Sequence, residues 1–112
     1  MDEKHRILKE IFGYDQFRGG QEPMIDAILQ GRDALGVMPT GAGKSICYQL
    51  PALMMPGVAL VVSPLISLMR DQVQALRQAG VAGAYLNSSL TPGQYVKALE
   101  NAYDGKYKII YV

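Results

Sequence analysis

The feature that most constrains the fold of this chain is a glycine-rich octet in its first half. The octet consists of Met38, Pro39, Thr40, Gly41, Ala42, Gly43, Lys44 and Ser45. An apolar run at residues 33–37 precedes it, and an apolar segment of helical character follows it as far as Pro51. A strand, a glycine-rich loop and a helix in direct succession are typical of α/β proteins with a parallel sheet. We therefore predict a first strand at residues 33–37 and a following helix that Pro51 kinks or ends.

The chemistry of the octet indicates a polyphosphate ligand. Glycine allows close approach of the backbone, and N–H groups at a helix N-terminus attract negative oxygens, so Gly41 and Gly43 are predicted to cradle phosphate. Lys44 would neutralise the terminal phosphate oxygens, and the hydroxyl of Ser45 would ligate Mg²⁺. The strict form of the pattern has glycine where this chain has Met38, so the match is incomplete. The alternative is an ordinary glycine-rich turn with a solvated lysine.

The rest of the chain alternates between helical and strand patterns. Asp2 is predicted to cap a first helix that stops at Gly13, and a second helix ends before Gly31. Further helices are expected at residues 65–79 and from Pro92, which Thr91 would cap, and further strands at residues 58–62, 84–86 and 107–112. This alternation predicts an α/β fold with a parallel sheet flanked by helices.

Composition limits the class of protein. The chain has 112 residues, of which 49% are apolar, and a formal net charge of +1, as expected for one globular domain. The near-neutral charge neither supports nor excludes a nucleic-acid partner. A single cysteine, Cys47, and a charged N-terminus favour a cytoplasmic protein. Residues 45–69 lack charge, but three prolines interrupt them, so we expect no membrane span.

A second group of candidate binding residues lies upstream of the octet, in residues 12–21. Gln21 carries an amide whose donor and acceptor complement the N6 amino group and N7 of adenine. The ring of Tyr14 or the guanidinium plane of Arg18 would stack on the base. The alternative is that these aromatics pack between two helices and that the glutamine is solvated.

These motifs, together with Cys47-Tyr48-Gln49-Leu50-Pro51-Ala52 and the segment of residues 63–72, resemble the RecQ family of superfamily 2 DNA helicases. The resemblance runs from about Ile7 to the last residue. It implies that residues 1–112 are the N-terminal portion of a RecA-like P-loop NTPase domain, truncated at its C-terminus, whose helices within residues 2–30 carry adenine recognition. Methionine at position 38 is usual in that family.

The resemblance also implies site residues and an activity. It assigns adenine to Tyr14, Arg18 and Gln21, the triphosphate of ATP to the octet, and Mg²⁺ to Ser45, with Lys44 and Ser45 as the catalytic residues. The implied activity is that of a 3′ to 5′ DNA helicase, which couples ATP hydrolysis to translocation on single-stranded DNA and duplex unwinding in DNA repair and recombination.

Residues 63–72 look like the family motif that contacts single-stranded DNA. The candidate contacts are Ser63, Pro64, Ser67 and Arg70, with Asn87 and Ser88 as further candidates. Ser63 and Pro64 follow a predicted strand, and α/β sheets place ligands at the carboxyl ends of their strands. Hydroxyl and guanidinium groups there would hold DNA phosphates without reading sequence. For Asn87 and Ser88 the alternative is a solvated turn.

One component of an ATP hydrolysis site is not visible in the sequence. After Lys44 the carboxylates are Asp71, Glu100 and Asp104, and none of them follows an apolar strand as a magnesium-binding carboxylate would. We therefore expect a truncated first motor domain that does not hydrolyse ATP by itself. His5 has no acidic or thiol neighbour at ligand spacing in the sequence, so we expect no site there.

Two other functions remain open at the level of sequence. A P-loop kinase would share the phosphate-binding octet but not the adenine and DNA motifs. A non-catalytic nucleotide-binding protein would naturally lack the carboxylate.

Overall fold

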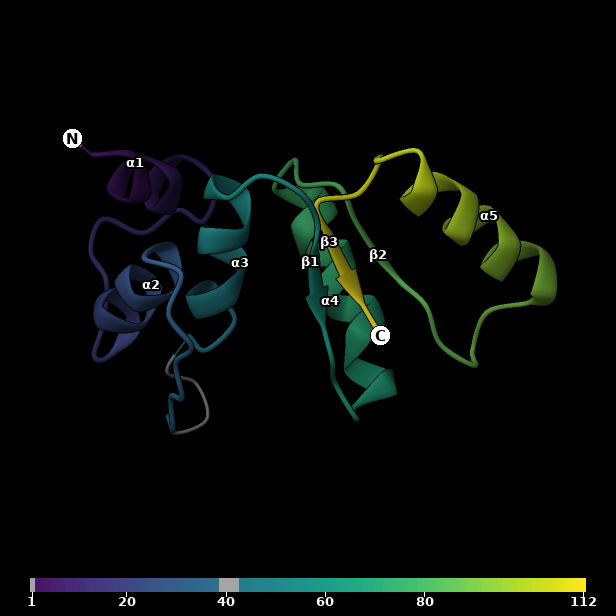
Figure 1. The fold of residues 1–112 in the computed structure, drawn as a ribbon, viewed down its shortest axis with the longest axis horizontal. Coiled ribbons are helices and arrows are strands. Elements are labelled where there is room, and N and C mark those ends of the chain that lie inside the picture. Colours follow the sequence, from purple (N-terminus) through teal and green to yellow (C-terminus); the bar gives the residue numbers. More distant parts are fainter. Residues whose placement is uncertain (1, 39–42) are drawn as a thin grey trace. The chain divides into compact units, whose positions relative to one another are not determined.

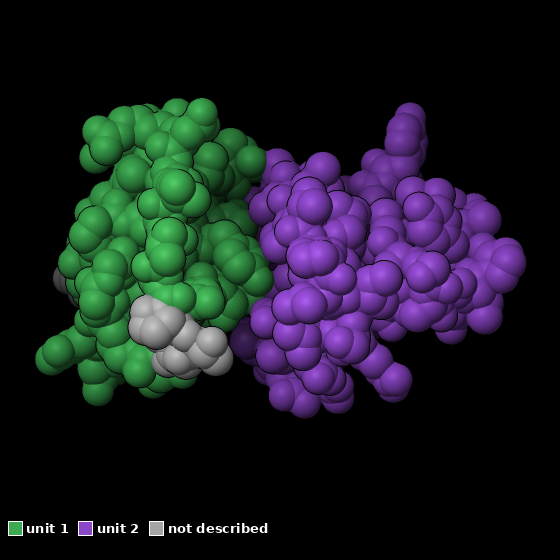
Figure 2. Space-filling view, turned by 90° about the horizontal axis from the view of Figure 1, so that it is seen from below, with its two compact units in different colours: residues 1–56 green, residues 57–112 purple. Residues whose placement is uncertain are grey.

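The computed structural model describes residues 2–38 and 43–112. The chain forms two compact units, one up to residue 56 and the other from residue 57 onward (Figure 2). In the described residues the first unit is helical, and the second carries the β-sheet (Figure 1). Each unit is described separately below.

The helical unit contains α1 (Glu3–Glu10), α2 (Gln21–Leu29) and α3 (Ile46–Met54). The side chain of Asp2 accepts a hydrogen bond from the backbone N–H of His5, so the predicted cap of α1 is confirmed. Gly13 adopts a positive φ of 79° just after this helix, which is the conformation that glycine tolerates best at a helix end.

The core of the helical unit joins all three helices. Ile7 and Leu8 come from α1, Ile25 from α2, and Ile46 and Leu50 from α3. Ile46 and Leu50 are about one helical turn apart on α3, and Ile7 and Leu8 are adjacent on α1, so these helices turn apolar residues toward a shared core. α3 packs against both α1 and α2 and is therefore the central element of this unit.

One prediction for this unit is wrong, and one of the two alternatives for Pro51 is excluded. Residues 33–37 are not a strand; they have no regular structure, and Leu35 and Val37 are 91% and 92% exposed. An apolar run becomes a strand only when another strand pairs with it, and the described sheet is built entirely from residues after 57. Pro51 does not end α3, because the helix continues to Met54 and the N–H of Met55 still bonds to the Pro51 carbonyl.

The sheet unit contains β1 (Ala59–Val61), α4 (Ile66–Gln78), β2 (Gly83–Tyr85), α5 (Pro92–Tyr103) and β3 (Ile109–Tyr111). The strand order is β1-β3-β2, and both pairings are parallel. Ile109 lies opposite Ala59 on one side and Gly83 on the other. The predicted α/β class with a parallel sheet is confirmed.

Burial differs sharply between elements of the sheet unit. All three residues of the central strand β3 are buried, and α4 packs against β2 through Met69, Val73 and Leu76. The helix α5 has no buried residue among those described, although Thr91 caps it as predicted and Gln94 completes a capping box. A good cap thus defines where α5 begins without requiring that it be packed.

Among the described residues, the helices are all too short, or too polar, to cross a membrane.

Candidate nucleotide-binding site

The described part of the octet leads directly into α3. Gly43, Lys44 and Ser45 precede the helix, and the carbonyls of Lys44 and Ser45 accept hydrogen bonds from the N–H groups of Cys47 and Gln49 at 3.1 and 2.9 Å. The candidate residues Pro39, Thr40, Gly41 and Ala42 lie outside the described residues. Lys44 is exposed at the positive end of the helix dipole, where an anion is favoured.

Gly43 occupies a position that favours glycine. Its φ is +73°, and a Cβ at this position would displace Nε2 of Gln21 and lie 3.3 Å from Nη2 of Arg18. Glycine is therefore favoured both by the backbone conformation and by the close approach of two candidate adenine-binding residues. A concave backbone surface without side chains is what a phosphate group needs in order to reach N–H groups.

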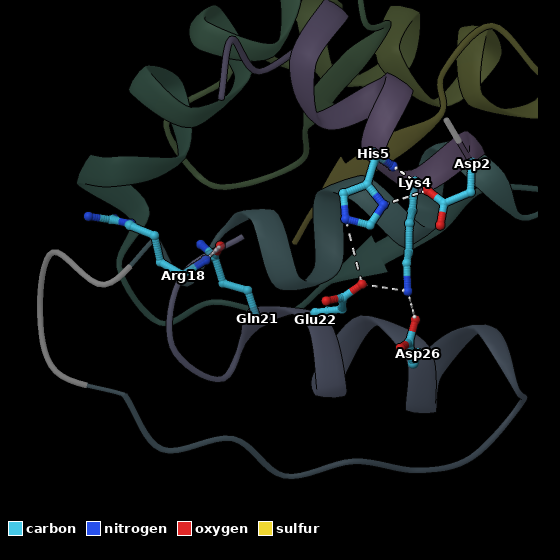
Figure 3. Close-up of polar contacts among 7 residues, drawn as sticks. All are labelled: Asp2, Lys4, His5, Arg18, Gln21, Glu22 and Asp26. Atoms are coloured by element: carbon cyan, nitrogen blue, oxygen red, sulfur yellow. Dashed lines mark hydrogen bonds and ion pairs between the residues drawn. The ribbon is translucent and has the colours of Figure 1, made fainter. Parts of the chain in front are cut away.

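Gln21 connects the two predicted motifs. Its Nε2 donates a hydrogen bond to the carbonyl of Gly43 at 3.1 Å, and its Oε1 accepts one from the backbone N–H of Arg18 at 2.8 Å. Gln21 is only 2% exposed, which excludes the alternative interpretation of a solvated glutamine. Figure 3 shows Arg18 and Gln21 side by side, with the Arg18 side chain extending away from the helix. The structure thus joins residues 22 positions apart.

The other two described candidates, Tyr14 and Met38, contact different parts of the helical unit. Tyr14 is 49% exposed, and its backbone N–H bonds to the Leu8 carbonyl at 3.1 Å. The Met38 side chain reaches α3, where Sγ of Cys47 lies 3.9 Å from its Sδ. A Cβ on Gly20 would lie 3.5 Å from Cε of Met38. Met38 therefore packs on the start of α3 and near the start of α2, a contact that spacing alone could not reveal.

Cys47 is buried at the start of α3. Burial raises the pKa of its thiol, because an apolar environment disfavours the thiolate. Cys47 is thus a packing residue of α3 rather than an activated nucleophile.

A cavity of about 750 Å³ also lies in the helical unit. Arg18, Gly20 and Met38 line it, together with Met24 of α2 and the extended residues 32–37. Gln21 and Lys44 do not line it. The hydrogen bonds of Gln21, rather than this cavity, therefore define the candidate nucleotide site.

His5 differs from expectation. The sequence suggested no acidic neighbour, but its Nδ1 pairs with the carboxylate of Asp2, and its Nε2 lies 3.7 Å from Oε2 of Glu22 on α2 (Figure 3). Its ring also contacts Phe17 edge-on at a centroid distance of 5.0 Å. Glu22 is 17 residues from His5, so only the packing of α1 on α2 brings this pair together.

The candidate DNA contacts belong to the sheet unit, and the structure brings only some of them together. Ser67 and Arg70, both exposed on α4, line a groove of about 720 Å³. Arg77, Tyr85 and Gln94 also line the groove and were not predicted as DNA contacts. They lie on three elements, so no single sequence motif contains them.

The other candidate DNA contacts are not in the lining of this groove. Ser63 accepts a hydrogen bond through Oγ from the N–H of Leu65 at 3.2 Å, just after β1. Asn87 follows β2 and accepts one through Oδ1 from the N–H of Ser89 at 2.8 Å. Pro64 and Ser88 are exposed beside them. Because β1 and β2 are parallel, the Ser63 and Asn87 loops emerge from the same edge of the sheet.

The three carboxylates that follow Lys44 lie on the helices of the sheet unit. Asp71 is within α4, Glu100 is within α5, and Asp104 is the C-cap of α5. All three are exposed. Ser45, the predicted magnesium ligand, is the N-cap residue of α3.

Comparison with known proteins agrees with this geometry. The profile of the DEAD/DEAH box helicase family matches residues 18–112. The ATP-dependent DNA helicase RecQ of Haemophilus influenzae is 52% identical over 106 residues, which cover 95% of this chain and 17% of the relative. RecQ of Bacillus subtilis is 47% identical over 107 residues, with 95% and 18% coverage. The resemblance inferred from the motifs is confirmed.

The relatives are much longer than the chain. RecQ of Synechocystis, at 48% identity over 105 residues, matches 94% of this chain but only 22% of its own length. The chain therefore spans less than a quarter of these relatives, and its matched region includes both the octet and the groove.

Proposed function

The chain belongs to the DEAD/DEAH box helicase family, and from this membership we propose that it is the ATP-binding portion of a 3′ to 5′ DNA helicase. The observation that supports this most strongly is the hydrogen bond from Gln21 to the Gly43 carbonyl, at 3.1 Å. A residue suited to recognise adenine is thereby held against the loop suited to bind phosphate. This arrangement favours an adenine nucleotide over the substrates of a kinase that shares only the loop.

In this proposal each described residue has a distinct role. Gln21 recognises the N6 and N7 edge of adenine, and Arg18 or Tyr14 stacks on the base. Gly43 leaves space for the phosphates, and Lys44 neutralises their terminal oxygens. Ser45 contributes a hydroxyl to Mg²⁺, which supplies charge neutralisation when bound.

The groove of the sheet unit is the proposed DNA contact. Arg70 and Ser67 are on the same helix face, three residues apart, and both line the groove. A guanidinium and a hydroxyl hold phosphate without distinguishing bases, as movement along DNA requires. The DNA strand would also be contacted where the loops leave the sheet, by Ser63, Pro64, Asn87 and Ser88. Unwinding itself is proposed for the complete protein, of which the chain covers a small share.

Nucleotide binding tests the first half of the proposal. Titration with fluorescent ATP and GTP analogues should show a preference for adenine in the unaltered chain. Lys44→Ala should lower the affinity for both nucleotides about 10- to 100-fold, because a charged hydrogen bond to phosphate is worth about 1.5–3 kcal/mol. Gln21→Ala should lower the affinity for the adenine nucleotide only. Lys97→Ala, which removes an exposed lysine of α5, is the matched control and should change neither.

One result would count against this proposal, and a second concerns the activity of the chain by itself. An unchanged adenine preference in Gln21→Ala would favour another P-loop enzyme. DNA-stimulated ATP turnover by the chain, abolished by Lys44→Ala, would refute the expectation that it cannot hydrolyse ATP by itself.

A further inference from the structure

A charge cluster links the first helix to the start of the second. Nζ of Lys4 on α1 lies 2.7 Å from Oδ1 of Asp26 and 2.8 Å from Oε2 of Glu22, both on α2 (Figure 3). The Lys4 side chain is only 17% exposed, whereas the two carboxylates are more open. Hydrogen bonds to Asp26 and Glu22 raise the pKa of Lys4, so it is charged at all physiological pH values.

The same turn of α1 also contacts the connector that precedes α2. The ring of His5 packs edge-on against Phe17 at 5.0 Å. Its orientation is set by Asp2, which accepts from the backbone N–H of His5 at 3.0 Å and pairs with its ring. Nε2 of His5 then lies 3.7 Å from Glu22. α1 therefore holds the chain at Phe17 and again at Glu22.

Gln21 lies between these two anchored positions. The first turn of α2 has no side-chain cap, since Gly20 is its N-cap residue, so the local sequence does little to fix where this turn begins. The position of Glu22 relative to α1 consequently sets the position of its neighbour Gln21. Gln21 in turn bonds to Arg18 and Gly43, at the proposed nucleotide site.

We propose that Lys4 is a positioning residue for adenine recognition, acting through Glu22 and Asp26 to hold Gln21 in register with Gly43. The inference rests on the proposed function, because it assumes that Gln21 reads the base. The polar contacts of Lys4 within the described residues are with Glu22 and Asp26, so its effect on Gln21 is exerted through α2.

The test compares nucleotide preference in matched variants of the full chain. Lys4→Met keeps the aliphatic stem and removes the charge, and should lower affinity for the ATP analogue about threefold, the equilibrium equivalent of a weak ion pair. Affinity for the GTP analogue should not change. Lys4→Arg should restore the preference. Arg6→Met is the control, because Arg6 pairs with Glu3 and Glu10 inside α1.

A double-variant cycle separates positioning from general stability. In a Gln21→Ala background, Lys4→Met should have no further effect on ATP affinity. If Lys4→Met proves poorly folded in a thermal melt, Asp26→Asn is the second variant. It removes the negative charge of one carboxylate paired with Lys4 and should likewise lower affinity for the ATP analogue but not for the GTP analogue.

Three outcomes would overturn the inference. Equal loss of ATP and GTP affinity would indicate a merely structural role. An unchanged preference in Lys4→Met, with a lost preference in Gln21→Ala, would refute the role of Lys4 and leave the proposed function standing. Loss of preference in neither variant would refute the proposed function and the inference together.

Discussion

The helical unit and the sheet unit hold their candidate site residues by different means. In the helical unit, hydrogen bonds join residues from distant parts of the sequence, as when Gln21 bonds to Gly43. In the sheet unit, no such bond among those described joins two candidate residues: Ser63 donates its N–H to the Val112 carbonyl, and Asn87 donates Nδ2 to Sδ of Met69. Their side-chain oxygens accept hydrogen bonds within their own loops, and the groove draws on other residues. The first arrangement favours a preorganised small-ligand site. The second suits an extended ligand that contacts several loop ends.

The two units also differ in how their apolar residues are buried. The helical core involves all three helices, whereas the sheet unit buries β3 and one stripe of α4 and leaves α5 without a buried residue. Exposed apolar side chains on β1 and α5, among them Leu60 and Leu99, accompany this arrangement. The two cores should therefore respond separately to loss of volume.

The largest expected effect is a pair of core truncations. Leu50→Ala in the helical unit and Ile109→Ala in the sheet unit each remove a fully buried side chain and should cost about 2–5 kcal/mol. Amide hydrogen exchange should rise mainly in α1–α3 for the first variant and mainly in the strands for the second. An equal rise in both units for either variant would show that the cores are not separate.

A smaller effect is expected from Gly43→Ala. The positive φ of 73° should cost about 1 kcal/mol for alanine, and the new Cβ would displace the amide of Gln21. Affinity for both nucleotides should fall, with a larger loss for the adenine analogue. Gly57→Ala, at a φ of 87° with open space around it, is the control for backbone strain alone. Equal nucleotide affinities in Gly43→Ala and Gly57→Ala would argue that the contact between Gln21 and Gly43 does not affect nucleotide binding.

The smallest effect concerns the caps of α1 and α5. The Asp2 carboxylate accepts a hydrogen bond from the ring of His5 and another from its backbone N–H. The ring contact first, and then the backbone contact, hold the pKa of Asp2 below its ordinary value of 3.8. Because the folded-state pKa is depressed, this cap stabilises α1 above pH 3.8 and is lost as the pH falls through the lower, folded value. The Thr91 cap of α5 carries no charge and should persist.

Amide exchange of His5 and Gln94, followed from pH 5 to pH 2.5, measures this difference between the caps. The Asp2→Asn variant keeps a capping oxygen without a titrating group, so its α1 should lose most of the acid response. An unaltered response in Asp2→Asn would mean that the Asp2 carboxylate does not control the acid response of α1.

Much of the local structure could be predicted because it depends on neighbouring residues. The caps at Asp2 and Thr91 and the stop at Gly13 rest on hydrogen bonds within a few residues, and all three are confirmed. The strand expected at residues 33–37 failed for the opposite reason, since a strand depends on a distant partner. Of the two alternatives for Pro51, the helix end is excluded because α3 continues past it, and the kink stays a prediction.

The sequence by itself determined the chemistry that this chain can offer. Lys44, Ser45, Gln21 and Arg70 supply the charge and the hydrogen-bonding groups, and their motifs identified the family. Only the tertiary structure decided which groups meet. The Gln21 bond to Gly43, the Lys4 cluster on α2, and the strand order β1-β3-β2 each join segments that are distant in sequence. Periodicity and capping act over one or two helical turns, whereas these contacts depend on how whole elements pack.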